Sequence, residues 1–273
     1  MNRFVSTAAL TLILLADGLT ASAQLIIAHR GASYDAPENT LAAFRLAWEQ
    51  NADGIEGDFY LTQDGQIVCT HDKTTKRVSP GLPELTISQT NLEELRRRDV
   101  GSWKNAKYAN ERMPTLQEVL AVVQPGKIIF VEIKCGPEIL PVMKPQLENS
   151  GLKAEQIVII CFNQEVVQEC RKLMPQYKVN WLTGYKQKGG IGPWSPSPES
   201  VVEMLKSTQA TGLGTQGKLQ VVDSDFVSSV RSSGKEFHVW TVNEPADAKA
   251  FQKLGADSIT TDRPAFLREV LGL

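Results

Sequence analysis

Apolar residues follow two alternating patterns along the chain from residue 24 onward. Short apolar runs, such as residues 25–29, predict strands. Between these runs lie segments whose apolar residues recur at helical spacing, as Leu41, Phe44 and Trp48 do within residues 38–51. This alternation predicts repeated βα units, which form a parallel sheet with right-handed crossovers.

The predicted strands each fill one short apolar or extended run. They cover residues 25–29, 54–61, 66–71, 127–134, 156–162, 177–182, 213–216, 236–242 and 258–261. The predicted helices lie between the strands. They cover residues 38–51, 89–98, 115–124, 138–149, 164–174, 199–209, 224–233 and 246–254, and a short helix ends the chain.

The number of units predicts the fold class. About eight βα units in roughly 250 residues is typical of an α/β TIM (β/α)8 barrel, which forms one domain. Residues 73–114 are less regular, and we interpret them as a small insertion after the second strand. An open doubly wound sheet is the alternative. No GxGxxG motif follows a strand, which disfavours a nucleotide-binding version of that sheet.

The first 23 residues are predicted to be a signal peptide. Arg3 precedes an apolar run at residues 8–16, which is too short to span a bilayer about 30 Å thick. Ala21-Ser22-Ala23 is a small-x-small cleavage pattern. We therefore expect a signal peptide at 1–23, a catalytic domain at 24–273 and a periplasmic or secreted location. An uncleaved membrane anchor is the alternative.

Composition restricts the partners of the exported chain. Its residues are 42% hydrophobic and 22% charged, and the formal net charge is −2 at pH 7. This balance gives no electrostatic reason to expect a nucleic acid or an anionic membrane as partner. After the leader, no apolar run approaches the about 18 residues of a membrane span. We expect a small-molecule substrate and no stable membrane insertion.

Four cysteines follow the leader: Cys69, Cys135, Cys161 and Cys170. An exported protein is permitted disulfides, and four cysteines allow three full pairings among which the sequence does not choose. Free buried thiols are an equal alternative, because a core of this size does not need disulfides. Their spacing lacks a CxxC pair, which disfavours a structural zinc site.

Charged residues gather at the ends of the predicted second and third barrel strands. Glu56 and Asp58 are two residues apart, as are Glu132 and Lys134, so each pair points to one face of its strand. Strand ends form the catalytic face of a TIM barrel. Three carboxylates in one barrel mouth would repel each other, and Ca²⁺ or Mg²⁺ would remove that conflict. Ordinary ion pairs with Lys134 and Arg30 are the alternative, and the spacing does not choose between them.

Two of the three histidines after the leader also fall at strand ends. His29 and His71 each lie beside a charged residue, whereas His238 lies within a strand and is expected to pack there. Imidazole titrates near neutrality, which suits one base and one acid. With Arg30 and Lys134 to neutralise an anionic ester, this set indicates phosphoryl transfer.

At this point the sequence resembles a known family, the glycerophosphodiester phosphodiesterases. The similar segments occur in order and cover nearly all of residues 25–268. They are His29-Arg30-Gly31, Ala36-Pro37-Glu38-Asn39-Thr40, the strand with Glu56 and Asp58, Leu61-Thr62-Gln63-Asp64-Gly65, His71-Asp72, Gly101-Ser102-Trp103, Glu111-Arg112-Met113-Pro114-Thr115-Leu116, Val131-Glu132-Ile133-Lys134, Val239-Trp240-Thr241-Val242-Asn243, Gly255-Ala256-Asp257 and Thr261-Asp262.

The resemblance implies a metal-dependent hydrolysis of glycerophosphodiesters to sn-glycerol 3-phosphate and an alcohol. It implies one divalent cation, Ca²⁺ or Mg²⁺, held by Glu56, Asp58 and Glu132, and acid and base roles for His29 and His71. In the family, the neighbouring glycerol hydroxyl attacks phosphorus, and water then opens the cyclic phosphate. Which histidine is the acid stays open.

The resemblance also implies roles for residues around this centre. Arg30 and Lys134 would bind the phosphate, and Trp240 would form an apolar wall for the glycerol. Glu38 and Asn39 would support the site from behind its ligands. The alternatives are helix capping for Asn39 and plain core packing for Trp240.

Three departures from the family pattern put the substrate preference in doubt. The segment after His71-Asp72 is Lys73-Thr74-Thr75-Lys76-Arg77-Val78, Cys161 stands where serine is common, and Cys135 directly follows Lys134. The alternative functions are a lysophospholipase D-like phosphodiesterase of the same barrel type and a non-catalytic binding protein. The Gly/Pro-rich loop at residues 186–198, which contains Trp194, would discriminate lipid substrates from deacylated ones.

Overall fold

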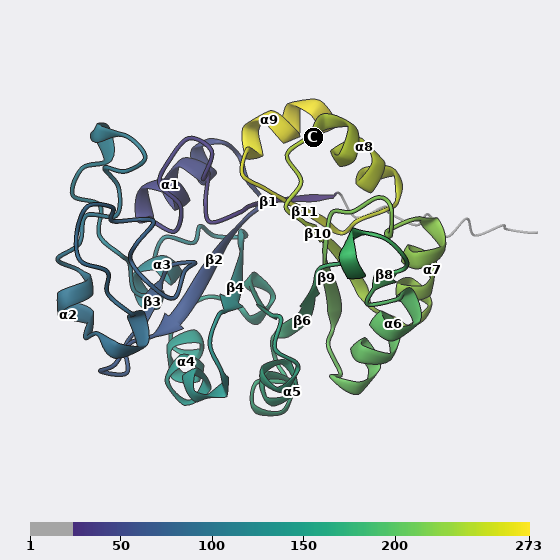
Figure 1. Cartoon of the computed structure of the whole chain (residues 1–273), viewed down its shortest axis with the longest axis horizontal. Coiled ribbons are helices and arrows are strands. Elements are labelled where there is room, and N and C mark those ends of the chain that lie inside the picture. The colour runs from purple at the N-terminus through teal and green to yellow at the C-terminus, as the bar shows by residue number, and fades with distance from the viewer. Residues whose placement is uncertain (1–23) are drawn as a thin grey trace, which may run out of the picture.

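The computed structural model describes residues 24–273 (Figure 1). The predicted signal peptide lies outside the described residues, so it and the export that it implies stay predictions. Within the described part, none of the helices has the length and apolar character that crossing a membrane needs.

Eight parallel strands form a closed barrel, which confirms the predicted TIM (β/α)8 fold. In spatial order they are β1 (Leu25–Ala28), β2 (Gly54–Leu61), β4 (Ile128–Ile133), β5 (Ile157–Cys161), β6 (Lys178–Thr183), β9 (Gly212–Gln216), β10 (Glu236–Trp240) and β11 (Ser258–Thr261). Pairing of β1 with both β11 and β2 closes the ring, so the alternative of an open sheet is wrong.

A helix follows each barrel strand and packs on the outside of the ring (Figure 1). These helices are α1 (Leu41–Glu49), α3 (Leu116–Leu120), α4 (Leu140–Glu148), α5 (Gln164–Leu173), α6 (Pro198–Ser207), α7 (Ser224–Ser232), α8 (Pro245–Lys253) and α9 (Pro264–Leu271). The predicted helix at 38–51 is too long at its beginning. Thr40 caps α1 by accepting a hydrogen bond from the Ala43 backbone N–H, so the first turn starts after the cap.

The segment between the second barrel strand and its helix is more irregular than the pattern predicts. Strand β3 (Ile67–Cys69) runs antiparallel to β2, as the turn signal indicates. The predicted helix at 89–98 shrinks to η1 (Ile87–Gln89) and α2 (Leu92–Leu95), followed by η2 (Ala106–Tyr108). Ile87 of η1 and Leu95 of α2 pack in a small apolar cluster that is separate from the main core.

The loop at residues 186–198 has more structure than predicted. It contains a two-stranded ribbon of β7 (Lys186–Gln187) and β8 (Trp194–Ser195), with η5 (Lys188–Gly190) between them. Trp194 lies under the ammonium of Lys218, 4.1 Å from the ring centroid. Ile191 at the tip is 83% exposed.

Two apolar layers hold the barrel and leave its mouth for polar groups. The larger layer lies between the ring of strands and the surrounding helices. The smaller fills the lumen with Ile27, Phe130, Val158, Ile160 and Leu182. All four cysteines are free: three are buried and Cys135 is half-buried.

Candidate active site

The barrel brings the predicted carboxylates together at the carboxyl ends of β2 and β4. Asp58 and Glu132 are register partners on these neighbouring strands, and Glu56 lies two residues before Asp58. Each of the three side chains offers an oxygen within 4.8 Å of the others. In residues 24–273 this is the one cluster of three or more such groups that could hold a metal ion.

Burial and crowding set the charge of this carboxylate cluster. Glu56, Asp58 and Glu132 are at most 8% exposed. Burial, with repulsion from Asp58, raises the pKa of Glu56 well above its usual range and that of Glu132 to about 7. Burial also acts on Asp58, but Lys134 and Arg30 offset it and leave the Asp58 pKa below its usual value. If all three carboxylates were ionised, the cluster would therefore carry more negative charge than its protein neighbours neutralise.

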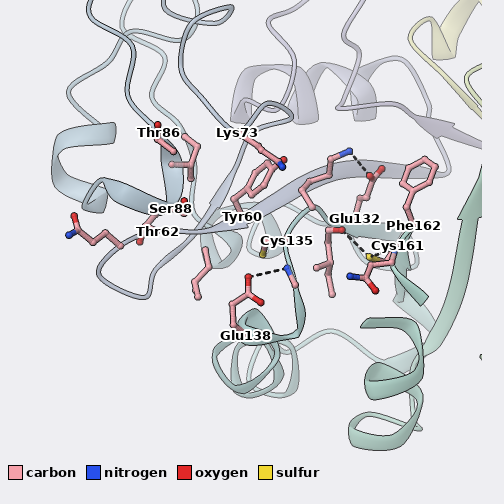
Figure 2. A pocket seen from close by; sticks show the side chains of 17 residues that line it. Tyr60, Thr62, Lys73, Thr86, Ser88, Glu132, Cys135, Glu138, Cys161 and Phe162 are labelled. Carbon is pink, nitrogen blue, oxygen red and sulfur yellow. Dashed lines mark hydrogen bonds and ion pairs between the residues drawn. The ribbon is translucent and has the colours of Figure 1, made fainter. Parts of the chain in front are cut away.

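Arg30 and Lys134 form ion pairs with two of the three carboxylates, Asp58 and Glu132, so the alternative of ordinary ion pairs is correct for these two. Arg30 Nε lies 3.2 Å from Asp58 Oδ2, and Lys134 Nζ lies 2.5 Å from Glu132 Oε1 and 3.3 Å from Asp58 Oδ1. Figure 2 shows the Glu132 contact. Within residues 24–273, Glu56 accepts a hydrogen bond only from the backbone N–H of Arg30, which lies 2.9 Å from Oε2.

The remaining oxygen of Glu56 tests whether a cation fits. Glu56 Oε1 is buried and has no hydrogen-bond partner among the described residues. A buried carboxylate oxygen without a partner is costly, and an all-oxygen donor set is the one that Ca²⁺ and Mg²⁺ prefer. The residues present therefore fit a hard divalent cation held by Glu56, Asp58 and Glu132.

The turn after β1 explains why His29-Arg30-Gly31 has this form. Arg30 adopts a left-handed conformation with φ 56°, which directs its N–H to Glu56. Gly31 follows with φ 80°, and a Cβ there would lie 2.7 Å or less from backbone atoms of Ala43. Only glycine fits such a close approach. The turn thus holds the Arg30 backbone and guanidinium against the carboxylate cluster.

Asn39 and Glu38 support the cluster in different ways. Asn39 donates through Nδ2 to Asp58 Oδ2 at 2.8 Å and accepts from the Asp58 N–H at 3.2 Å. It does not cap α1, so the capping alternative is wrong. Glu38 accepts from Arg30 at 3.0 Å and from both terminal nitrogens of Arg77. Arg77, from the segment that departs from the family pattern, was not predicted.

His71 follows β3 and is anchored by its neighbour. Its Nδ1 lies 2.7 Å from Asp72 Oδ1, and Arg77 Nε donates to the other oxygen of Asp72 at 2.8 Å. Burial lowers the pKa of His71, although Asp58 and Asp72 oppose the shift. The Asp72 carboxylate, with a pKa of about 2, is ionised, so the proton of a neutral His71 belongs on Nδ1 and Nε2 is free to accept another.

His29 follows β1, is less exposed than His71, and is anchored by Asp262. Its Nδ1 lies 2.7 Å from Asp262 Oδ1. Ser33 also donates to Asp262 at 2.9 Å, and Asn243 at 2.7 Å, and the pKa of Asp262 is about 2. Sequence reasoning assigned no role to Asp262. The sequence could have indicated this contact, because Asp262 directly follows β11, and β11 pairs with β1 where the barrel closes.

For the acid or base role that the resemblance implies for His29, replacing Asp262 by asparagine is expected to lower kcat at least about 10²-fold with little change in KM, since an amide no longer fixes the proton on Nδ1 of His29. Steady-state kinetics on a diester of the kind that the resemblance implies, with thermal unfolding as the control for folding, measures this. A kcat within threefold of the unaltered enzyme would remove Asp262 from the mechanism.

The predictions for the ring side chains of His238 and Trp240 have different outcomes in the structure. His238 is buried, with Nδ1 2.8 Å from Ser258 Oγ and Nε2 3.3 Å from Glu236, as expected of a packing residue. Trp240 lines a narrow hollow in the lumen that His29 and Glu132 also line. Its ring meets Phe162 edge to face, with centroids 5.4 Å apart. Its role as a glycerol wall stays a prediction.

The mouth of this barrel thus combines a buried carboxylate cluster, two fixed cations and two histidines that are each held at Nδ1 by an aspartate. Such a set is able to neutralise an anionic ester and to move protons at it, which is the arrangement expected of a TIM-barrel hydrolase of phosphate esters. Residues 29–266 match the Glycerophosphoryl diester phosphodiesterase family, and the chain belongs to that family. This membership confirms the predicted class of enzyme and argues against a non-catalytic binding protein.

Individual relatives agree with the family match. The glycerophosphodiester phosphodiesterase of Caldanaerobacter subterraneus subsp. tengcongensis is 33% identical over 251 residues, which cover 89% of this chain and 96% of that protein. The Bacillus subtilis glycerophosphodiester phosphodiesterase is 28% identical over 263 residues, with 90% and 86% covered. The structure of an Oleispira antarctica phosphodiesterase in complex with the product sn-glycerol-3-phosphate has a TM-score of 0.80 and 26% identity, with 91% and 97% covered.

Proposed function

We propose that this enzyme hydrolyses glycerophosphodiesters to sn-glycerol 3-phosphate and an alcohol, with His29 and His71 as its acid and base and with a divalent cation at the carboxylate cluster. The observation that carries the two-histidine part is the pair of 2.7 Å contacts from Nδ1 to Asp262 and Asp72. Two imidazoles with anchored Nδ1 atoms present Nε2 for proton transfer to and from the substrate. The product-bound Oleispira relative supports the choice of product.

Arg30 and Lys134 are the groups proposed to bind the phosphate. Both side chains are largely enclosed, and their carboxylate partners hold them in place. Arg30 provides a planar fork for two phosphate oxygens and Lys134 a point charge. When bound, a divalent cation would neutralise the carboxylates and add positive charge beside the phosphate. Either Ca²⁺ or Mg²⁺ suits the donor set.

A substrate panel tests the proposal. Glycerophosphocholine, glycerophosphoethanolamine and glycerophosphoglycerol should each yield sn-glycerol 3-phosphate, and EDTA should lower the rate by at least about 10²-fold until Ca²⁺ or Mg²⁺ is restored. Lysophosphatidylcholine is included because the exposed tip of the β7–β8 ribbon offers an apolar contact at Ile191. Faster turnover of the lysolipid would favour the lysophospholipase D-like alternative. Full activity after complete metal removal would overturn the metal assignment.

A further inference from the structure

A groove of about 680 Å³ opens beside the candidate active site. Its walls come from the end of β2, the ends of β4 and β5, and the segment that carries Lys73 and η1 (Figure 2). Glu132 and Lys134 form its inner end, so the groove begins at the carboxylate cluster. From there it extends past Tyr60 to Ser88 and Glu138.

The groove differs in size from the hollow on the other side of Glu132. The hollow that Trp240 lines has a volume of about 30 Å³, against about 680 Å³ for the groove. A phosphodiester places two substituents on one phosphorus atom, and one of them must leave as the alcohol. The groove is the much larger space next to Lys134, and it has room for an alcohol of several heavy atoms.

The walls of the groove combine aromatic faces with two opposite charges. Phe162 is 45% exposed and offers ring surface to a ligand, and Lys134 Nζ lies 5.9 Å from its ring centroid, whereas Tyr60 lines the groove but is only 7% exposed. Glu138 accepts a hydrogen bond from the Gly136 N–H at 3.0 Å, and no cation pairs with it in the described part of the chain. In Figure 2, Lys73 and Glu138 lie on opposite sides of the groove, with Tyr60 between them.

We propose that this groove binds the alcohol part of the diester, and that Glu138 favours an alcohol with a positively charged amine, such as choline or ethanolamine. The inference rests on the proposed function. A free carboxylate attracts an ammonium, and the exposed ring of Phe162 offers surface to its methyl or methylene neighbours. Lys73 would repel that ammonium, so the amine is expected at the Glu138 side of the groove.

Two charge variants on opposite walls test the selection. The measured quantity is the ratio of kcat/KM for glycerophosphocholine to kcat/KM for glycerophosphoglycerol, which is neutral in its alcohol. Glu138→Gln is expected to lower this ratio at least about fivefold, whereas Lys73→Gln is expected to leave it unchanged or raise it. An unchanged ratio in Glu138→Gln, or an equal fall in both variants, would overturn the role of Glu138.

A bulky side chain tests whether the groove holds the alcohol at all. Ser88→Trp fills the groove from η1 and is expected to lower kcat/KM for glycerophosphocholine at least about tenfold more than for glycerophosphomethanol. Ser228→Trp, on the exposed face of α7, is the matched control and should change neither. Equal effects of Ser88→Trp on both diesters would overturn the groove while leaving the proposed function intact. An unaltered enzyme that releases no glycerol 3-phosphate from any diester would sink the proposed function itself.

Discussion

Alanine at either His29 or His71 is expected to lower kcat by at least about 10²-fold, because in the proposed mechanism each change removes either the acid or the base. Each variant also leaves its aspartate anchor, Asp262 or Asp72, with one contact fewer but with its other donors in place. The fold is therefore expected to survive. Glycerol 3-phosphate release under saturating substrate and metal measures the effect.

The third histidine provides the matched control. His238→Gln removes an imidazole from the same lumen but from a residue whose ring contacts are Ser258, Glu236 and Phe130. We expect a lower melting temperature and a kcat within about threefold of the unaltered enzyme. If His29→Ala or His71→Ala behaves like this control, that histidine has no part in the mechanism.

The barrel could be predicted from the sequence because each βα unit carries its own signal. The strand predicted at residues 258–261 has the same ends as β11, and the helix predicted at residues 164–174 is one residue longer than α5. The helix predicted at 89–98 failed for a physical reason. Only four of its residues form an α-helix, α2. Leu95 of α2 packs into the small separate apolar cluster, and the next residue, Arg96, forms an ion pair with Glu118 on α3. Tertiary contacts there override helical propensity.

The candidate site could be predicted where a residue lies at a strand end, and not where its partner lies far along the chain. Glu56 and Asp58 share a face by strand geometry alone. The contact of His29 with Asp262 spans 233 positions and exists only because β11 closes on β1. The contact of Glu38 with Arg77 depends on how an irregular segment folds back over the mouth. No local pattern encodes either contact.

Replacing Glu56 by glutamine separates the cation's contribution from that of the fold. The amide keeps the shape of the side chain but removes a carboxyl group whose ionisation beside Asp58 and Glu132 is unfavourable, so the metal-free variant should melt at the same temperature as the metal-free parent or higher. In the parent, a cation at 100 times its Kd should raise the melting temperature by roughly 5–10 °C. Glu56→Gln should lose both this rise and most of the activity.

Glu203→Gln, an exposed carboxylate on α6, should keep both the cation-induced rise and the activity, which makes it the matched control. Differential scanning fluorimetry with and without Ca²⁺ or Mg²⁺ measures the rise. A Glu56→Gln variant that still gains stability from the cation would place the metal elsewhere. A Glu56→Gln variant that loses the cation-induced rise in melting temperature but hydrolyses its substrate normally would show that the cation stabilises the barrel mouth without taking part in hydrolysis. If the cation serves both stability and hydrolysis, the variant must lose both together.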